Sequence, residues 1–99
     1  MTIERLVGLQ VTDEAGYQAY REHMTPILHA HGGDFGHDFR IAEVLRSATE
    51  APINRVFTIH FPDAATLDAF FSHPDYLAVR AKYYTPSVSH ATELARYER

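Results

Sequence analysis

The segment from Ile53 to Tyr84 constrains the fold of this chain most strongly, because it predicts a strand, a sharp stop and a broken helix in that order. Up to Phe61 it is rich in valine, isoleucine and phenylalanine at alternating positions, a composition that favours a β-strand. Pro62 then ends the strand, and Asp63 is a typical N-cap for the helix that follows.

The helical part of this segment carries one apolar stripe and one interruption. Apolar side chains recur at intervals of three and four residues and predict a single buried face: Leu67, Phe70, Phe71, Pro74, Leu77 and Ala81. The sequence Ser72-His73-Pro74-Asp75 interrupts the helix. We expect Ser72 to cap a second helical piece, with Asp75 as its capping-box partner. Pro74 then lies in the first turn, where a missing N–H costs little.

A similar unit precedes this segment. We expect a strand over Arg5–Val11, followed by a helix that begins at Thr12-Asp13 and ends at Gly32-Gly33, where one glycine can adopt the left-handed conformation. The buried stripe of this helix is expected at Tyr17, Tyr20, Met24, Ile27, Leu28 and His31. Pro26 removes a backbone hydrogen bond to Glu22, so we expect a kink or a loosened turn there.

The remaining strands complete two strand-helix-strand units in a single domain, residues 1–99. A second strand is expected over Phe35–Leu45. Its apolar residues occupy odd positions at first and even positions toward its end, which a β-bulge would explain. The third strand is expected over Asn54–Phe61 and the last over His90–Tyr97. This order predicts an α+β, ferredoxin-like βαββαβ fold. Its four-stranded antiparallel sheet would have both helices on one face and the first and third strands at its centre.

The predicted sheet has two unlike faces. One face is strongly apolar and would pack under the helices: Val7, Leu9, Val11, Phe57, Ile59 and Phe61. The other is mixed: Leu6, Gly8, Gln10, Val56, Thr58 and His60, with Phe39 and Ile41 as further members. This second face is too apolar to be left in water and too polar for an ordinary core. We therefore expect a homodimer in which two sheets cover one another face to face.

Composition argues against several kinds of partner. The net charge is −4 and the sequence has no block of lysine and arginine, which argues against nucleic acid and anionic membranes as partners. No apolar run reaches the ~20 residues that a membrane span requires. The first residues do not resemble a signal peptide, so we expect a cytoplasmic protein. The absence of cysteine excludes disulfides and thiolate chemistry.

Several segments together resemble a known bacterial family. They are PILHAHGGDF after a helix that contains a Tyr-Arg pair, then EVL, VFTIHFPDAATLDAFF and SHPDYLAVR. Over roughly Val11 to Tyr84 the chain resembles domain-of-unknown-function family 1330, which belongs to the dimeric α/β-barrel superfamily. The resemblance implies paired ferredoxin-like monomers that form a barrel. It also implies a small-molecule pocket, often between the helices and the sheet of each monomer.

The superfamily covers several chemistries, so the resemblance does not select one. Its members include cofactor-free quinone-forming monooxygenases, haem-degrading enzymes, lactone isomerases and stress-responsive domains. Haem-degrading members place a ligating histidine on the second helix, four residues after an aromatic residue. These two positions correspond to Arg80 and Tyr76 here, and arginine cannot serve as the proximal haem ligand. We therefore expect no haem, and we predict no other cofactor.

The seven histidines raise the question of a metal site, but their spacing argues against one. His29 and His31 point about 200° apart on a helix, and no two histidines stand four residues apart. We therefore expect no metal. His37 and His60 are the better pair, because a hairpin would bring them onto neighbouring strands. They are either structural histidines that neighbouring groups satisfy, or a pair that handles a proton or orients a ligand.

Tyrosines of the two helical segments define a second group of candidates. They either fill the core or line a cavity that binds a planar ligand. The candidate ligand-binding residues are Tyr17 and Tyr76, with Arg21 and Arg80 for an anionic group. Tyr20 belongs to the same group.

These residues predict a protein that binds a small aromatic or apolar acid. If the protein is an enzyme, we expect proton transfer or oxygenation of an activated carbon acid. His60 or His37 would then act as the base, and Tyr20 would orient the substrate. The alternative is a non-catalytic structural or stress-associated domain whose cavity is closed by aromatic side chains.

Overall fold

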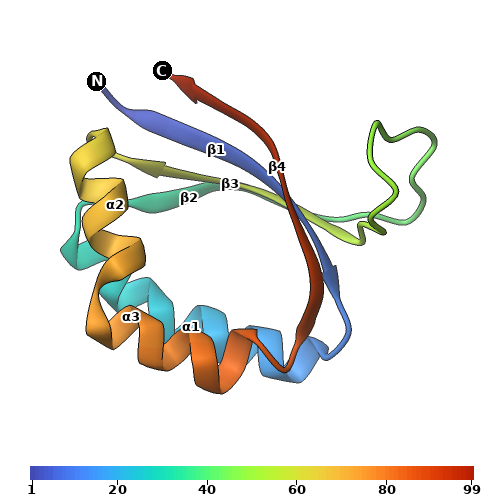
Figure 1. The fold of residues 1–99 in the computed structure, drawn as a ribbon, viewed down its shortest axis with the longest axis horizontal. Coiled ribbons are helices and arrows are strands. Elements are labelled where there is room, and N and C mark those ends of the chain that lie inside the picture. Colours follow the sequence, from blue (N-terminus) through green and yellow to red (C-terminus); the bar gives the residue numbers. More distant parts are fainter.

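Two strand-helix-strand units build the chain, as the sequence predicts. The elements are β1 (Ile3–Val11), α1 (Glu14–Ala30), β2 (Asp34–Arg40), β3 (Arg55–Phe61), α2 (Ala64–Ser72), α3 (Pro74–Val79), a π-helical turn (Arg80–Tyr84) and β4 (Val88–Glu98). The structure is a computed structural model that describes residues 1–99, and all its helices lie on one side of the sheet (Figure 1). None of these helices has the length and apolarity that a membrane crossing requires.

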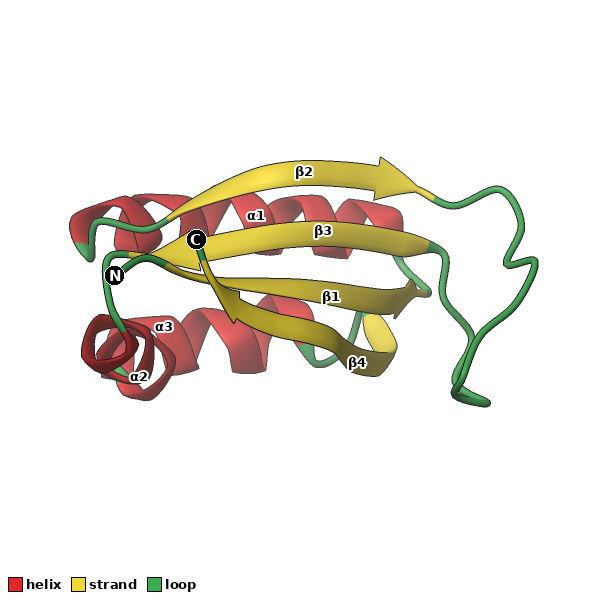
Figure 2. Ribbon diagram, turned by 90° about the horizontal axis from the view of Figure 1, so that it is seen from above, coloured by secondary structure: helices red, strands yellow, loops and turns green.

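The four strands form one sheet in the order β2-β3-β1-β4, and every neighbouring pair is antiparallel (Figure 2). The prediction that the first and third strands are central is therefore confirmed. In the pairing of β1 with β3, Val7 lies opposite Phe57, and both side chains are buried under the helices. The side of the sheet away from the helices, hereafter the outer face, carries Leu6, Gly8, Gln10, Val56, Thr58 and His60.

The ends of the two long helical segments follow the predicted capping chemistry. The Asp13 carboxylate accepts a hydrogen bond from the Gly16 N–H at 3.1 Å, and that of Asp63 accepts one from the Thr66 N–H at 2.7 Å. Gly32 has a φ of 75° and ends α1, while the Gly33 N–H donates to the Leu28 carbonyl at 3.0 Å. Only glycine adopts this left-handed conformation without steric cost, which explains Gly32. At Gly33 a Cβ atom would come within 2.9 Å of the His60 carbonyl oxygen, so close packing explains the second glycine.

The break between α2 and α3 is capped by a residue other than the predicted one. The N-cap of α3 is His73, whose Nδ1 accepts the Asp75 N–H at 3.1 Å. The Ser72 hydroxyl instead donates back to the Asp68 carbonyl at 2.8 Å, so it is not available as a cap. Pro74 lies in the first turn of α3, as predicted.

The second strand is shorter than predicted. A register shift between Phe35 and Asp38 confirms the bulge, but β2 ends at Arg40 and residues 41–54 form an irregular loop that projects from the end of the sheet (Figure 1). After Arg40 a single hydrogen bond, from the Ile41 N–H to the Asn54 carbonyl at 2.8 Å, closes the base of this loop. The last strand is longer than predicted, because β4 begins at Val88.

The apolar stripes are confirmed for α1 and corrected for α3. Tyr17, Tyr20, Met24 and Leu28 are buried in α1, which runs through Pro26 without interruption. In α3, however, Leu77 is 43% exposed and Tyr76 is the buried residue. The break at His73 starts a new helix whose buried face is rotated relative to that of α2. The three- and four-residue spacing of α2 therefore does not continue into α3.

Parts of the outer face are already covered within one chain, which the sequence did not predict. Ile53 lies over Gly8, where a Cβ atom would come within 2.9 Å of the isoleucine side chain. Thr58 is buried because the bulge of β2 covers it, and its Oγ1 accepts the His37 N–H at 2.7 Å. Gln10 and His60 remain half-buried.

The corrected stripe can be tested with a matched pair of substitutions. Phe70 is fully buried against Phe61, Phe71 and Tyr76, so Phe70→Ala should lower the free energy of unfolding by about 3–5 kcal/mol. Leu77→Ala on the exposed side of α3 should change it by about 0.5 kcal/mol or less. Urea denaturation of both variants measures the difference. A Leu77→Ala variant as unstable as Phe70→Ala would contradict the packing of α3 described above.

Candidate functional site: a cavity between the helices and the sheet

A cavity of about 440 Å³ lies between the helices and the sheet, within the range of small-molecule sites. Its walls come from β1, β2, β3 and β4 on one side and from α1, α2, α3 and the π-helical turn on the other. Thirteen of its twenty lining residues are hydrophobic, among them Leu9, Met24, Ile59 and Phe71. The helix–sheet interface is therefore not completely filled by aromatic side chains, and most of the cavity surface suits an apolar ligand.

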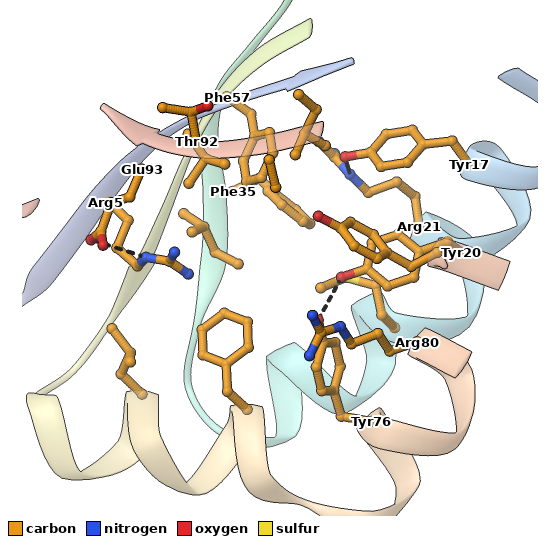
Figure 3. A pocket seen from close by; sticks show the side chains of 18 of the residues that line it. Arg5, Tyr17, Tyr20, Arg21, Phe35, Phe57, Tyr76, Arg80, Thr92 and Glu93 are labelled. Atoms are coloured by element: carbon orange, nitrogen blue, oxygen red, sulfur yellow. Dashed lines mark hydrogen bonds and ion pairs between the residues drawn. The ribbon is translucent and has the colours of Figure 1, made fainter. Parts of the chain in front are cut away.

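Two tyrosine hydroxyls meet at one side of the cavity. The Tyr20 and Tyr76 hydroxyl oxygens lie 2.9 Å apart and share a hydrogen bond, drawn as a dashed line in Figure 3. Burial raises the pKa of Tyr20 well above its usual value, and the Tyr76 hydroxyl adds to the effect. Burial also raises the pKa of Tyr76. Both phenols therefore keep their protons at neutral pH and can act as hydrogen-bond donors.

Arg80 lies beside this pair on the π-helical turn (Figure 3). A hydrogen bond of 3.0 Å from the Thr85 N–H to the Arg80 carbonyl, between residues five positions apart, defines the π-helical turn. Such turns are frequent at functional sites. The Arg80 guanidinium forms no ion pair, and its carbon lies 5.6 Å from the centre of the Tyr84 ring.

Arg21 and Tyr17 form a second polar group at the cavity wall. The Arg21 Nε donates to the Tyr17 hydroxyl at 2.8 Å, and the guanidinium carbon lies 3.9 Å from the centre of the Phe35 ring. The remaining nitrogens of Arg21 reach the Asp38 carboxylate at 3.3 and 3.4 Å. Arg55 donates to the same carboxylate with two hydrogen bonds of 2.8 Å. Arg21 is therefore already paired with a carboxylate of the protein.

The remaining charged residues of the cavity lie toward β4. Glu93 accepts hydrogen bonds from Arg5 at 3.3 Å and from Arg96 at 2.6 Å. Asp68 of α2 is the other acidic residue of the lining. The lining therefore contains four arginines and two carboxylates, in a chain whose net charge is −4. Among the four arginines, Arg80 alone has no carboxylate partner, so it is the cation most available to a ligand.

The predicted tyrosine and arginine candidates converge on this cavity. Tyr17, Tyr20, Arg21, Tyr76 and Arg80 all line it. The signal for this set was residue type on the two helical segments, because the buried face of each helix must turn toward the sheet.

The predicted histidines lie elsewhere. His60 and His37 are not among the cavity residues; both lie on the side of the sheet away from the helices, where His37 stacks on Phe39 with ring centres 5.7 Å apart. No hydrogen bond joins the two histidines, since His60 is opposite Asp34 and the bulge places the His37 backbone against Thr58. A base from this pair and Tyr20 therefore do not meet at one site within a single chain. No group of histidine and acidic side chains in the structure could hold a metal ion.

Several residues of the cavity lining were not predicted from the sequence. Arg5, Glu93 and Arg96 reach the cavity from the two paired strands β1 and β4. Arg5 has the same strand parity as Val7 and Leu9, which was a usable signal. For Glu93 there was none, because a register shift in the β1–β4 pairing changes which side of the sheet the residues of β4 face.

Fold and cavity together define a small α+β protein of the ferredoxin-like type with an internal cavity between its helices and its sheet. The sequence matches the family model described as Domain of unknown function (DUF1330) over residues 5–93. The chain therefore belongs to this family, which confirms the family prediction.

Solved structures of related shape confirm the fold. A protein of unknown function from Rhodopseudomonas palustris superimposes with a TM-score of 0.83 at 17% identity, covering 99% of this chain and 82% of that one. A dabb family protein with a ferredoxin-like fold from Mesorhizobium loti gives 0.69 at 19% identity, covering 99% and 96%. A dimeric ferredoxin-like protein of unknown function from Thermobifida fusca gives 0.62 at 12% identity, covering 100% and 92%. No curated protein matches the sequence.

The Asp38 carboxylate makes a pH-dependent contribution to stability that can be measured. Burial alone would raise its pKa, but the hydrogen bonds and charges of Arg55 and Arg21 outweigh burial, and the pKa is lowered. Asp38→Asn leaves Arg55, which is 9% exposed, with only the more distant Glu14 carboxylate at 3.6 Å, and should cost roughly 1–3 kcal/mol at pH 7. A lowered pKa stabilises the fold above the unfolded value, about 3.9, and the stabilisation is lost as the pH falls through the folded value.

The difference between wild type and Asp38→Asn should therefore be constant near neutral pH and shrink below about pH 4. Urea denaturation across the pH range measures it. Asp34→Asn is the matched control on the same strand, because the Asp34 pair with His29 is more than half exposed and should contribute about 1 kcal/mol or less. A difference that is independent of pH, or equal in the two variants, would argue against this network.

Proposed function

We propose that the protein binds a small aromatic or apolar acid in the cavity between its helices and its sheet. The observation that carries this proposal is the combination of an apolar cavity of about 440 Å³ with one arginine, Arg80, that has no carboxylate partner in the protein. Apolar walls favour the body of such a ligand through burial, and Arg80 favours its anionic group.

The charge of the cavity supports an anionic rather than a cationic ligand. Glu93 is held between Arg5 and Arg96, and the charge of Arg21 is balanced by Asp38. Asp68 is thus the one carboxylate of the lining without an arginine partner, and it lies on a different helix from Arg80. An anion near Arg80 would meet a cation and the one O–H proton that the Tyr20–Tyr76 hydrogen bond leaves free.

The cavity also bears on the alternative of a purely structural domain. In that case aromatic side chains would fill the helix–sheet interface, whereas here a volume sufficient for a small ligand remains. If the protein is also an enzyme, the reaction we propose is proton transfer or oxygenation of an activated carbon acid, with Tyr20 orienting the substrate. A catalytic base in the same cavity would then have to come from residues other than His37 and His60.

Ligand binding can be tested with benzoate and its neutral isostere benzamide. We expect benzoate to bind about tenfold more tightly, a factor equivalent to 1.4 kcal/mol, because only benzoate places a negative charge at Arg80. Isothermal titration calorimetry measures both affinities, and the thermal midpoint should rise with benzoate concentration. Equal affinities would remove the argument for an acid.

A pair of variants connects this binding to the cavity. Ala91 lines the cavity from β4 and is exposed, so Ala91→Phe should fill part of the space and abolish benzoate binding without unfolding the protein. Ala65→Phe on the exposed side of α2 adds the same bulk away from the cavity and should bind like wild type. Unchanged binding by Ala91→Phe would place the ligand elsewhere.

We also propose that the protein forms a homodimer through the outer faces of two sheets. Large apolar side chains are exposed on this face and on the loop beside it: Phe39, Val44, Leu45, Leu94 and Tyr97. Similar structures from Thermobifida fusca and a Jannaschia species are described as dimeric ferredoxin-like proteins. A second sheet would bury these side chains, together with the half-buried Gln10 and His60, in an isologous contact.

The dimer can be tested with a charge placed on each side of the molecule. Phe39 is 53% exposed on the outer face, and Phe39→Glu should give a monomer because two carboxylates would be buried in a symmetric contact. Leu77 is 43% exposed on the helical side, and Leu77→Glu should leave the dimer intact. Sedimentation at micromolar concentration distinguishes the two. A wild-type protein that sediments only as a monomer would exclude this assembly.

A further inference from the structure

One of the two O–H donors of the Tyr20–Tyr76 pair has no hydrogen-bond acceptor in the protein. Each hydroxyl carries one proton, and the 2.9 Å hydrogen bond between them uses only one of the two. Neither hydroxyl makes a hydrogen bond to any other group of the protein. Whichever tyrosine donates, the second O–H proton has no acceptor in the protein and is available at the cavity.

Arg80 adds further donors at the same place. Its guanidinium carries five N–H donors and no acceptor, and none of these is taken by a carboxylate of the protein. Its positive charge is close enough to the Tyr76 hydroxyl to oppose the rise in the Tyr76 pKa that burial causes. The π-helical turn that carries Arg80 also places Tyr84 in the cavity lining, so the two residues cover this side together.

We propose that Arg80 and the Tyr20–Tyr76 pair form a donor-only site for a single charged oxygen, and that the cavity binds phenols and enols as their oxyanions. The inference rests on the proposed function and makes it more specific, since it assigns the acidic group of the ligand to a phenol or an enol. Donors fixed in position around a developing oxyanion stabilise it more than water does, because they need no reorganisation.

The surroundings of the site favour the ionised form of the ligand. The raised pKa values of Tyr20, Tyr76 and Tyr84, which burial causes, keep these phenols neutral, so none competes with the ligand for the negative charge. Among the carboxylates of the lining, Glu93 is paired with Arg5 and Arg96, and Asp68 is exposed on α2. Arg21 is paired with Asp38 and leaves Arg80 as the free cation.

Ionisation of the ligand requires no further reagent. The O–H bond of the phenol or enol breaks, its electron pair stays on the oxygen that faces Arg80 and the tyrosines, and the proton passes to water. No group is oxidised or reduced. The tyrosines keep their own protons throughout and contribute only hydrogen bonds.

The experiment uses 4-nitrophenol as the probe, because its absorbance distinguishes the neutral from the ionised form. A pH titration of the bound probe gives its pKa in the cavity. We expect the pKa to fall by roughly one to three units relative to the free probe, the range that a nearby opposite charge produces. Arg80→Gln and Tyr76→Phe should each reverse a large part of this shift.

Two controls show whether the change in pKa comes from the proposed site, rather than from disruption of the cavity or from any nearby positive charge. Lys82→Gln removes a cation from the same π-helical turn, where Lys82 lies against Tyr83 outside the cavity lining, and should leave the shift unchanged. The neutral probe 4-nitroanisole has the same ring but no ionisable proton. Its binding to Arg80→Gln and Tyr76→Phe, measured by calorimetry, shows that the cavity of each variant is intact.

The outcomes distinguish this inference from the function on which it rests. If 4-nitrophenol binds with an unshifted pKa while benzoate still binds, the oxyanion site is wrong and the binding cavity stands. A shift that survives in both Arg80→Gln and Tyr76→Phe would also overturn the assignment. If neither benzoate nor 4-nitrophenol nor 4-nitroanisole binds, both proposals fail together.

Discussion

The packing of one aromatic cluster under α2 determines which part of the helix–sheet interface is close-packed and which part contains the cavity. Phe61 at the end of β3 contacts Phe70 and Phe71, and both of these contact Tyr76, with ring centres 4.5 to 5.7 Å apart. Close-packed rings of this size fix the separation between helices and sheet. Since Phe71 and Tyr76 also line the cavity, the same cluster that holds α2 and α3 in place forms its wall.

The polar groups of the cavity follow from the same geometry. Tyr20 and Tyr76 come from different helices and are both buried, so their hydroxyls must satisfy one another or remain without a partner. Arg21 and Arg55 instead share Asp38, which ties α1 to the edge of the sheet. Arg80, in contrast, lies beside these phenols without a carboxylate partner, and the proposed anion site rests on this arrangement.

The sequence predicted what depends on periodicity and missed what depends on local rotation or register. Strand alternation predicted β1 and β3, the handedness of the crossovers placed them at the centre of the sheet, and helical spacing predicted the buried tyrosines of α1. The same reasoning failed at Leu77, because the break at His73 resets the helix, and it failed to foresee Glu93, because a register shift in the β1–β4 pairing changes its side of the sheet. Cavities themselves leave no periodic signal, since a residue that lines a space and one that fills it both occupy the same face.

The two faces of β1 connect the two proposed properties of the protein. Val7 and Leu9 point into the cavity, whereas Leu6, Gly8 and Gln10 between and beside them point to the outer face. Because side chains alternate along a strand, a shift of one residue in the pairing of β1 would exchange the two sets. The register that keeps Leu9 in the cavity is therefore the same register that keeps Gln10 on the outer face, where we propose the second sheet to lie. A contact that fixes β1 from outside would also fix the walls of the cavity.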